Sequence, residues 1–123
     1  MCARLLIVDD SNIIRRAIAA YSEGLALSIV ATASDGQAAL DLLEQHQPDL
    51  VTMDITMPNL DGLSCLQEIM SRRPNTRVLI VSALSDRATG LQALKLGAAG
   101  FLPKPFTREQ LRDELLHIMG EPA

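Results

Sequence analysis

Short apolar runs alternate along this chain with longer segments whose apolar residues recur at helical spacing, and this alternation limits the folds open to it. The apolar runs cover residues 5–8, 27–33, 49–54, 78–82 and 101–102. Apolar runs of this length that contain β-branched residues are typical of buried strands. The alternation therefore predicts an α/β fold, in which a doubly wound five-stranded parallel sheet is covered on both faces by five helices.

Residues that start helices mark the beginnings of the amphipathic segments. Ser11 is placed to cap the first segment, and Asp35 with Gly36 opens the second. Thr107 and Gln110 have the spacing of a capping box at the start of the last one. We therefore expect helices at about residues 11–23, 35–47, 60–72, 86–96 and 107–119.

Length and composition indicate one globular domain. The chain has 123 residues, 48% of them apolar, which is enough for a substantial core. We therefore expect residues 1–123 to form a single domain. The net charge of −4 argues against a general nucleic-acid surface. Because no apolar run has the length of a membrane span or a signal peptide, we expect a cytoplasmic protein whose Cys2 and Cys65 are reduced.

Polar side chains stand at the ends of four of the five predicted strands. Asp9 and Asp10 follow the first strand, Asp54 ends the third, Ser82 ends the fourth, and Lys104 follows the fifth. Each residue alone has an ordinary explanation, such as a helix cap, a turn or a solvated lysine. Because the carboxyl ends of parallel strands meet at one edge of a sheet, we expect these side chains to lie together.

This set of residues has a definite chemistry. Two carboxylates ~4 Å apart repel each other by ~4 kcal/mol at an effective dielectric constant of ~20. A hard divalent cation offsets this repulsion, and a site made only of oxygen ligands suits Mg²⁺. Lys104 can hold further negative charge, and Ser82 can donate a hydrogen bond to it. Together these groups favour phosphoryl transfer onto Asp54.

The same residues resemble a known family. Five ordered motifs match the receiver domains of two-component response regulators, and the resemblance covers essentially the whole chain. Among receivers, the chain is most similar to the single-domain chemotaxis type. The motifs are Asp9-Asp10, Asp54 with Met57-Pro58, Asp61-Gly62, Ser82-Ala83 and Lys104-Pro105.

The resemblance implies a fold and a phosphorylation site. It implies a flavodoxin-like sheet with strand order 2-1-3-4-5, and transfer of a phosphoryl group to Asp54 from the phosphohistidine of a sensor histidine kinase. It also implies that Asp10 and Asp54 bind Mg²⁺ directly, together with the backbone carbonyl of Thr56, while Asp9 acts through water. The protein would then catalyse only its own phosphorylation and dephosphorylation.

The resemblance also implies a switch. Ser82 would donate a hydrogen bond to a phosphoryl oxygen and Lys104 would pair with the phosphoryl group, the bond before Pro105 being cis. Inward movement of Ser82 would leave space for Phe101, which changes the surface of the fourth helix, fifth strand and fifth helix for a protein partner. We also predict slow self-dephosphorylation, because an apolar Leu84 cannot position the hydrolytic water.

Three alternatives remain open at this point. The chain can be the receiver part of a longer regulator with a DNA-binding or methylesterase domain. A phosphatase with an aspartate nucleophile is disfavoured, because Thr56 stands where that class needs a second acid. A flavodoxin is disfavoured because no phosphate-binding loop follows the first strand.

The sequence does not identify the kinase or the target, and it allows a monomer or a phosphorylation-dependent dimer. We interpret Arg15 and Arg16 as an exposed helix face that can help to dock a kinase.

Overall fold

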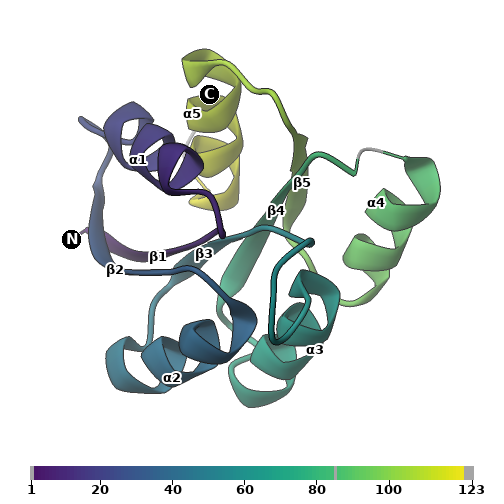
Figure 1. Ribbon diagram of the computed structural model, residues 1–123. Coiled ribbons are helices and arrows are strands. Elements are labelled where there is room, and N and C mark those ends of the chain that lie inside the picture. Colours follow the sequence, from purple (N-terminus) through teal and green to yellow (C-terminus); the bar gives the residue numbers. More distant parts are fainter. Residues whose placement is uncertain (1, 85, 121–123) are drawn as a thin grey trace.

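A computed structural model describes residues 2–84 and 86–120 of the chain. Strands and helices alternate throughout these residues, as the sequence predicts (Figure 1). Each of the first four helices therefore connects one strand to the next, and α5 follows the last strand. The elements are β1 (Ala3–Val8), α1 (Asn12–Tyr21), β2 (Leu27–Ala33), α2 (Gly36–His46), β3 (Leu50–Met53), α3 (Gly62–Arg72), β4 (Arg77–Ser82), α4 (Arg87–Lys95), β5 (Gly100–Pro103) and α5 (Arg108–Ile118).

The strands form one parallel sheet in the order β2-β1-β3-β4-β5, which confirms the predicted topology. Helices α1 and α5 cover one face, while α2, α3 and α4 cover the other (Figure 1). Because successive side chains of a strand point to opposite faces, each central strand supplies both cores. In β1, for example, Leu6 and Val8 join the core under α2 and α3, and Leu5 and Ile7 join the core under α1 and α5.

The predicted helix caps are present. The side chain of Ser11 accepts a hydrogen bond from the backbone of Ile14, and that of Asp35 accepts one from Ala38. Thr107 and Gln110 form the capping box of α5. Helix α3, however, begins at Gly62 rather than at residue 60, because its cap is Asp61. Helix α1 likewise ends at residue 21, two residues earlier than predicted.

The two cysteines differ in environment. Cys2 is exposed, whereas Cys65 is buried in α3, and both are free thiols. The Cys65 thiol donates a hydrogen bond to the carbonyl of Gly36 at 3.6 Å. Burial raises the pKa of this thiol to about 12, which leaves it protonated and unreactive at neutral pH. In the described ranges, no helix has the length and hydropathy needed to cross a membrane.

Candidate functional site

The two central strands of the sheet bring Asp9 and Asp54 side by side. Val8 and Met53 are paired at the ends of β1 and β3, and each aspartate is the next residue. The ladder continues through one more hydrogen bond, from the Asp54 amide to the Val8 carbonyl at 3.0 Å. Because this position terminates both strands, the two carboxylates emerge at the carboxyl edge of the sheet.

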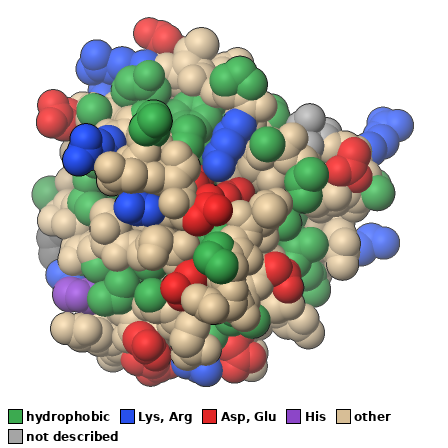
Figure 2. All heavy atoms as spheres, viewed as in Figure 1, with side chains coloured by type: hydrophobic (Ala, Val, Ile, Leu, Met, Phe, Trp, Pro, Cys, Tyr) green, Lys and Arg blue, Asp and Glu red, His purple; other side chains and the backbone are tan. Residues whose placement is uncertain are grey.

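A third acid completes the cluster. Carboxylate oxygens of Asp9, Asp10 and Asp54 all lie within 4.8 Å of one another, as the sequence predicts. Asp9 and Asp54 are buried, with exposed fractions of 0% and 4%, whereas Asp10 faces solvent. Figure 2 shows acidic side chains gathered in the middle of this face of the molecule, beside a basic group. Oxygen ligands with one side open to water are a suitable site for a hard divalent cation.

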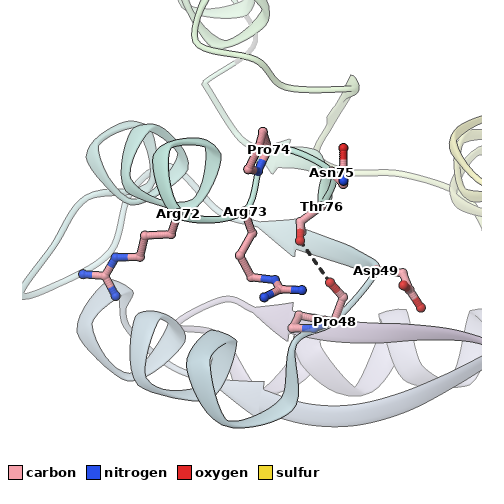
Figure 3. A pocket seen from close by; sticks show the side chains of 7 residues that line it. All are labelled: Pro48, Asp49, Arg72, Arg73, Pro74, Asn75 and Thr76. Carbon is pink, nitrogen blue, oxygen red and sulfur yellow. Dashed lines mark hydrogen bonds between the residues drawn. The ribbon is translucent and has the colours of Figure 1, made fainter.

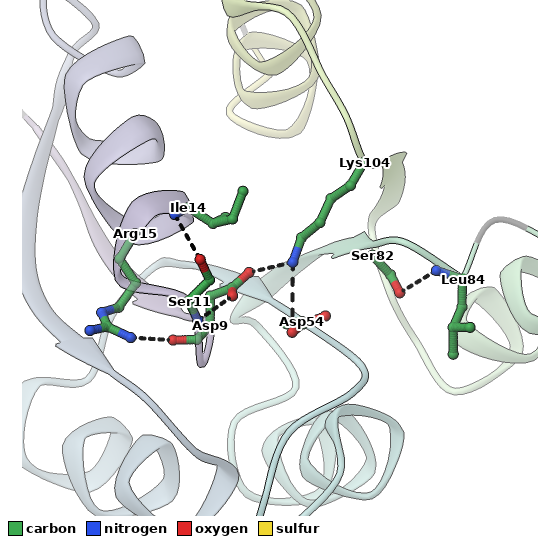
Figure 4. Close-up of polar contacts among 8 residues, drawn as sticks. All are labelled: Asp9, Ser11, Ile14, Arg15, Asp54, Ser82, Leu84 and Lys104. Carbon is green, nitrogen blue, oxygen red and sulfur yellow. Dashed lines mark hydrogen bonds and ion pairs between the residues drawn. The ribbon is translucent and has the colours of Figure 1, made fainter.

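Lys104 reaches the same cluster from the loop after β5. Its Nζ lies 2.9 Å from Oδ2 of Asp9 and 3.7 Å from Oδ2 of Asp54 (Figure 4). The Lys104 amide donates to the Ser82 carbonyl at 2.8 Å, which fixes the lysine backbone beside the end of β4. The Lys104–Pro105 peptide bond is cis, and this confirms the implication of the resemblance. The lysine therefore neutralises part of the charge of the buried acids.

The environment of Asp54 changes its acidity. Burial, and then the neighbouring charge of Asp9, raise the pKa of Asp54 from 3.8 to about 6, whereas Lys104 and a hydrogen bond from the backbone of Thr56 lower it. The net rise shows that Lys104 alone does not offset the cost of ionising a buried carboxylate. Additional positive charge at the cluster would favour the ionised form, which is the form that can act as a nucleophile.

The first turn after β1 holds Asp9 in place and corrects one expectation. Oδ1 of Asp9 accepts a hydrogen bond from the Ser11 amide at 2.9 Å. Arg15 is half-buried and donates from Nη1 to the Asp9 carbonyl at 2.6 Å, so the expectation that Arg15 is exposed was wrong. The long side chain folds back because the strand end offers it a free carbonyl. Only Arg16 lies on the exposed face.

Ser82 ends β4 and is fully buried, but its hydroxyl lies outside the acidic cluster. Its Oγ accepts a hydrogen bond from the Leu84 amide at 3.0 Å (Figure 4). Phe101 is half-buried on β5 and packs against the core under α2, α3 and α4. Thr56 is exposed in the loop that follows Asp54. The structure therefore groups Asp9, Asp10, Asp54 and Lys104, and it leaves Ser82, Phe101 and Thr56 around them.

Two glycines that were not predicted as site residues hold the loop after Asp54. A Cβ at Gly62 would lie 2.1 Å from the Asp54 carbonyl oxygen, and one at Gly36 would lie 2.3 Å from the carbonyl oxygen of Leu60. Asn59 adopts a φ of +70° and donates a hydrogen bond from its side chain to Asp35 at 3.0 Å. The sequence signal was the repeated Asp-Gly pair, at residues 35–36 and 61–62, in which a capping acid precedes a closely packed glycine.

Comparison with known proteins identifies the family. The family model of the response regulator receiver domain matches residues 5–116. The chain belongs to this family. As a receiver domain, it is a component of two-component signalling systems, which confirms the resemblance seen in the sequence.

Three relatives show which proteins this receiver domain is similar to. It is 36% identical to the chemotaxis protein CheY of Bacillus subtilis, covering 94% of this chain and 96% of that protein. It is 43% identical to protein-glutamate methylesterase/protein-glutamine glutaminase 3 of Vibrio cholerae, covering 83% of this chain and 29% of that protein. The structure of the CheX–CheY–BeF3–Mg²⁺ complex from Borrelia burgdorferi contains a similar chain, with a TM-score of 0.92, 34% identity, and coverage of 95% and 89%.

The relatives therefore include both single-domain and multidomain proteins. The receiver spans nearly the whole of the CheY protein but less than a third of the methylesterase. Both architectures that the sequence left open thus exist among proteins similar to this chain.

Proposed function

We propose that this receiver domain accepts a phosphoryl group on Asp54 from the phosphohistidine of a sensor histidine kinase. The proposal depends on one observation: three acids lie within 4.8 Å of one another, with the Lys104 ammonium 2.9 Å from one of them. In the transfer, a carboxylate oxygen of Asp54 forms a bond to phosphorus. The bond between phosphorus and the imidazole nitrogen breaks, and the imidazole leaves with the electron pair and takes up a proton.

The residues of the cluster fit Mg²⁺. They offer only oxygen ligands, and the exposure of Asp10 leaves room for water. In our proposal, Asp10, Asp54 and the backbone carbonyl of Thr56 bind the ion directly, and Asp9 acts through water. When bound, the ion supplies positive charge that neutralises the phosphoryl oxygens and offsets the mutual repulsion of the acids.

Lys104 and Ser82 bind the transferred phosphoryl group, and the movement of Ser82 couples its presence to a change of surface. The Lys104 ammonium already lies 3.7 Å from Asp54, so a phosphoryl group there would pair with it. Ser82 would release the Leu84 amide and donate its hydroxyl to a phosphoryl oxygen. The space vacated by Ser82 would then be filled by Phe101, which is half-buried on β5. The result is a population shift in the surface of α4, β5 and α5.

The partners follow from this chemistry and from the relatives. A kinase delivers the phosphoryl group, and a target protein binds one state of the α4–β5–α5 surface more tightly. The similarity to CheY supports a chemotaxis role, and the similarity to the methylesterase supports the alternative of a longer regulator with an effector domain. We propose that residues 1–123 form one receiver domain whose own catalysis is limited to its phosphorylation and dephosphorylation.

Replacing Asp54 with Asn tests the assignment. The wild-type protein, incubated with Mg²⁺ and a small phosphodonor such as acetyl phosphate, should gain the mass of one phosphoryl group. The Asp54→Asn variant should gain none, and Asp41→Asn, which alters an exposed acid on α2, should behave like the wild type. Intact-protein mass spectrometry makes the measurement. Undiminished labelling of Asp54→Asn would refute the proposal, and continuous turnover of phosphate esters would favour the phosphatase alternative.

A further inference from the structure

A second site candidate lies at the edge of the sheet opposite Asp54. A cavity of about 270 Å³ opens there between two turns, one preceding β3 and the other preceding β4 (Figure 3). Its lining comes from residues 48–49 and 72–76. Asp54 and the other residues proposed for phosphoryl transfer follow the carboxyl ends of the strands, whereas this cavity lies before their amino ends. The length of β3 therefore separates the cavity from Asp54.

Backbone and side-chain hydrogen bonds hold the two walls together. Thr76 donates from Oγ1 to the Pro48 carbonyl at 3.1 Å, and both residues are buried. The Arg77 amide donates to the Asp49 carbonyl at 2.9 Å, and the Thr76 amide donates to the Arg73 carbonyl at 3.0 Å. The cavity is therefore formed by the fold itself and does not depend on a ligand to assemble it.

Arg73 brings an unsatisfied charged group to this cavity. Its Nε is buried and has no hydrogen-bond partner within residues 2–84 and 86–120. Two acids of the neighbouring helices, Glu44 and Glu68, pair with Arg72 instead, at 3.3 and 3.2 Å. Figure 3 shows Arg72 directed away from the Arg73 guanidinium, which extends toward Pro48. A buried guanidinium N–H without an acceptor is costly, and no ion pair joins Arg73 to an acid of the described residues. An anion bound in the cavity that Arg73 lines would therefore stabilise this charge.

We propose that the cavity binds one anionic group, a carboxylate or a phosphate, through the Arg73 guanidinium. The planar guanidinium presents paired donors that match the oxygens of both groups. The Asp49 carboxylate lines the other end of the cavity and accepts a hydrogen bond from the Arg4 amide at 2.8 Å. Because Asp49 repels a second negative charge, the site favours a ligand that presents a single anionic group. The source is a free small anion or an acidic side chain of another protein.

Chemical-shift titration of the ¹⁵N-labelled protein tests this inference and separates the two sources. The probes are sodium phosphate, sodium acetate and N-acetylglutamate amide, each added at constant ionic strength because salt screens weak ion contacts. We expect the amides of Asp49, Asn75 and Thr76 to shift and saturate, with a dissociation constant on the order of 1 mM for the best probe. Preference for phosphate or acetate indicates a free anion, and preference for the glutamate amide indicates a protein side chain.

Matched variants test whether the Arg73 side chain is responsible for anion binding. Arg73→Gln should weaken binding by about tenfold or more. Arg87→Gln, which removes an exposed arginine from α4, should leave binding unchanged. Arg73→Lys keeps the charge without the paired donors and should bind with intermediate affinity, so it serves as the test if Arg73→Gln does not fold. Shifts that fail to saturate with every probe, or that persist in both Arg73 variants, would overturn the proposal. The result does not depend on whether Asp54 is phosphorylated.

Discussion

Burial gives the Asp54 side chain its unusual properties at the residue scale. A carboxylate with an exposed fraction of 4% loses most of its hydration, and Asp9 adds a like charge next to it. The Asp54 carboxyl is therefore harder to ionise than an ordinary aspartate, and a bound cation would favour its ionised form.

The acidity of Asp54 predicts a pH-dependent stability. Its folded-state pKa of about 6 exceeds the ordinary 3.8, so the folded protein binds this proton more tightly than the unfolded chain does. The resulting stabilisation is complete below pH 3.8 and is lost as the pH rises through 6. Without Mg²⁺ at neutral pH, Asp54→Asn should therefore raise the free energy of unfolding by on the order of 2–3 kcal/mol.

Urea unfolding of both proteins across this pH range makes the measurement, with a chelator present. The difference between the variant and the wild type should shrink toward zero as the pH falls to 4. Adding Mg²⁺ should stabilise the wild type more than the variant. Parallel pH profiles for the two proteins would contradict the assigned pKa.

The predicted lifetime of the phosphoryl group on Asp54 depends on Leu84. Its side chain is 47% exposed and apolar, so it can neither orient nor deprotonate an attacking water. Leu84→Glu should speed the decay of the phosphorylated protein by on the order of tenfold, because a carboxylate can act as a general base. Leu91→Glu, which alters a leucine of α4 that is 53% exposed, is the matched control. Equal decay rates for Leu84→Glu and the wild type would show that this residue does not limit hydrolysis.

The sequence predicts the positions of the site residues better than their side-chain contacts. Asp9, Asp54 and Lys104 could be placed together because strand ends in a parallel sheet share one edge. The direction of the Ser82 hydroxyl could not be predicted, since it depends on a local hydrogen bond from the Leu84 amide. The rotamer of a buried hydroxyl follows from its partners in three dimensions, and a pattern of residue types does not specify them.

At the scale of whole elements, arginines from elsewhere in the chain cap the carboxyl ends of three helices. Arg4 donates to the His46 carbonyl of α2 at 2.9 Å, and Arg77 donates to the Ile118 carbonyl of α5. Arg112 donates to the carbonyl of Tyr21, the last residue of α1, at 3.0 Å, and to that of Glu23, just beyond it, at 2.6 Å. The last carbonyls of a helix lack partners within it and carry partial negative charge, so each guanidinium both satisfies and neutralises them.

This arrangement makes Arg112 a structural link between α5 and α1. Arg112→Gln should lower the free energy of unfolding by about 1–3 kcal/mol, because it removes two hydrogen bonds from a charged donor. Arg108→Gln changes an exposed arginine in the first turn of the same helix and should cost much less. Chemical denaturation of the two variants checks this. A loss for Arg112→Gln no larger than that for Arg108→Gln would rule out the capping role.

The sequence predicted the residues that cap helices better than it predicted the loop before α3 and its tertiary contacts. The caps formed by Ser11, Asp35 and Thr107 follow from short-range chemistry that the sequence contains. The start of α3 was placed two residues early, because the cap is Asp61, whose backbone is extended and whose side chain accepts from the Ser64 amide. The close approach of Gly62 to the Asp54 carbonyl is a tertiary contact, so periodicity alone could not predict it.

On the scale of the whole molecule, the sheet separates two cores that share its strands. Leu66 and Ile69 of α3 lie in one core, and Leu111 and Leu115 of α5 lie in the other. Because β1, β3 and β4 have side chains in both, neither core can open without disturbing the other. The domain should therefore unfold as one cooperative unit.

The two thiols provide a direct test of this cooperativity. Cys2 is exposed and should react with a thiol reagent at once. Cys65 is fully buried and should react only when the whole domain unfolds, since its pKa of about 12 and its place in the core block local access. The rate of the second reaction, followed over a urea series, should rise with the same urea dependence as global unfolding. Rapid labelling of both cysteines in native buffer would show that α3 opens independently.

The hydrogen bond from the Leu84 amide to the Ser82 hydroxyl affects how often the unphosphorylated protein would adopt an active-like conformation. The resting hydroxyl already has a partner, so any conformer in which it faces Asp54 must first give up about 1 kcal/mol. Conformers with the hydroxyl turned toward Asp54 should therefore be about fivefold less populated than they would be without this hydrogen bond. In the proposed switch, a phosphoryl group that offers a charged acceptor would more than replace the lost bond. The hydrogen bond between Ser82 and Leu84 would thus lower the fraction of unphosphorylated protein that binds a target.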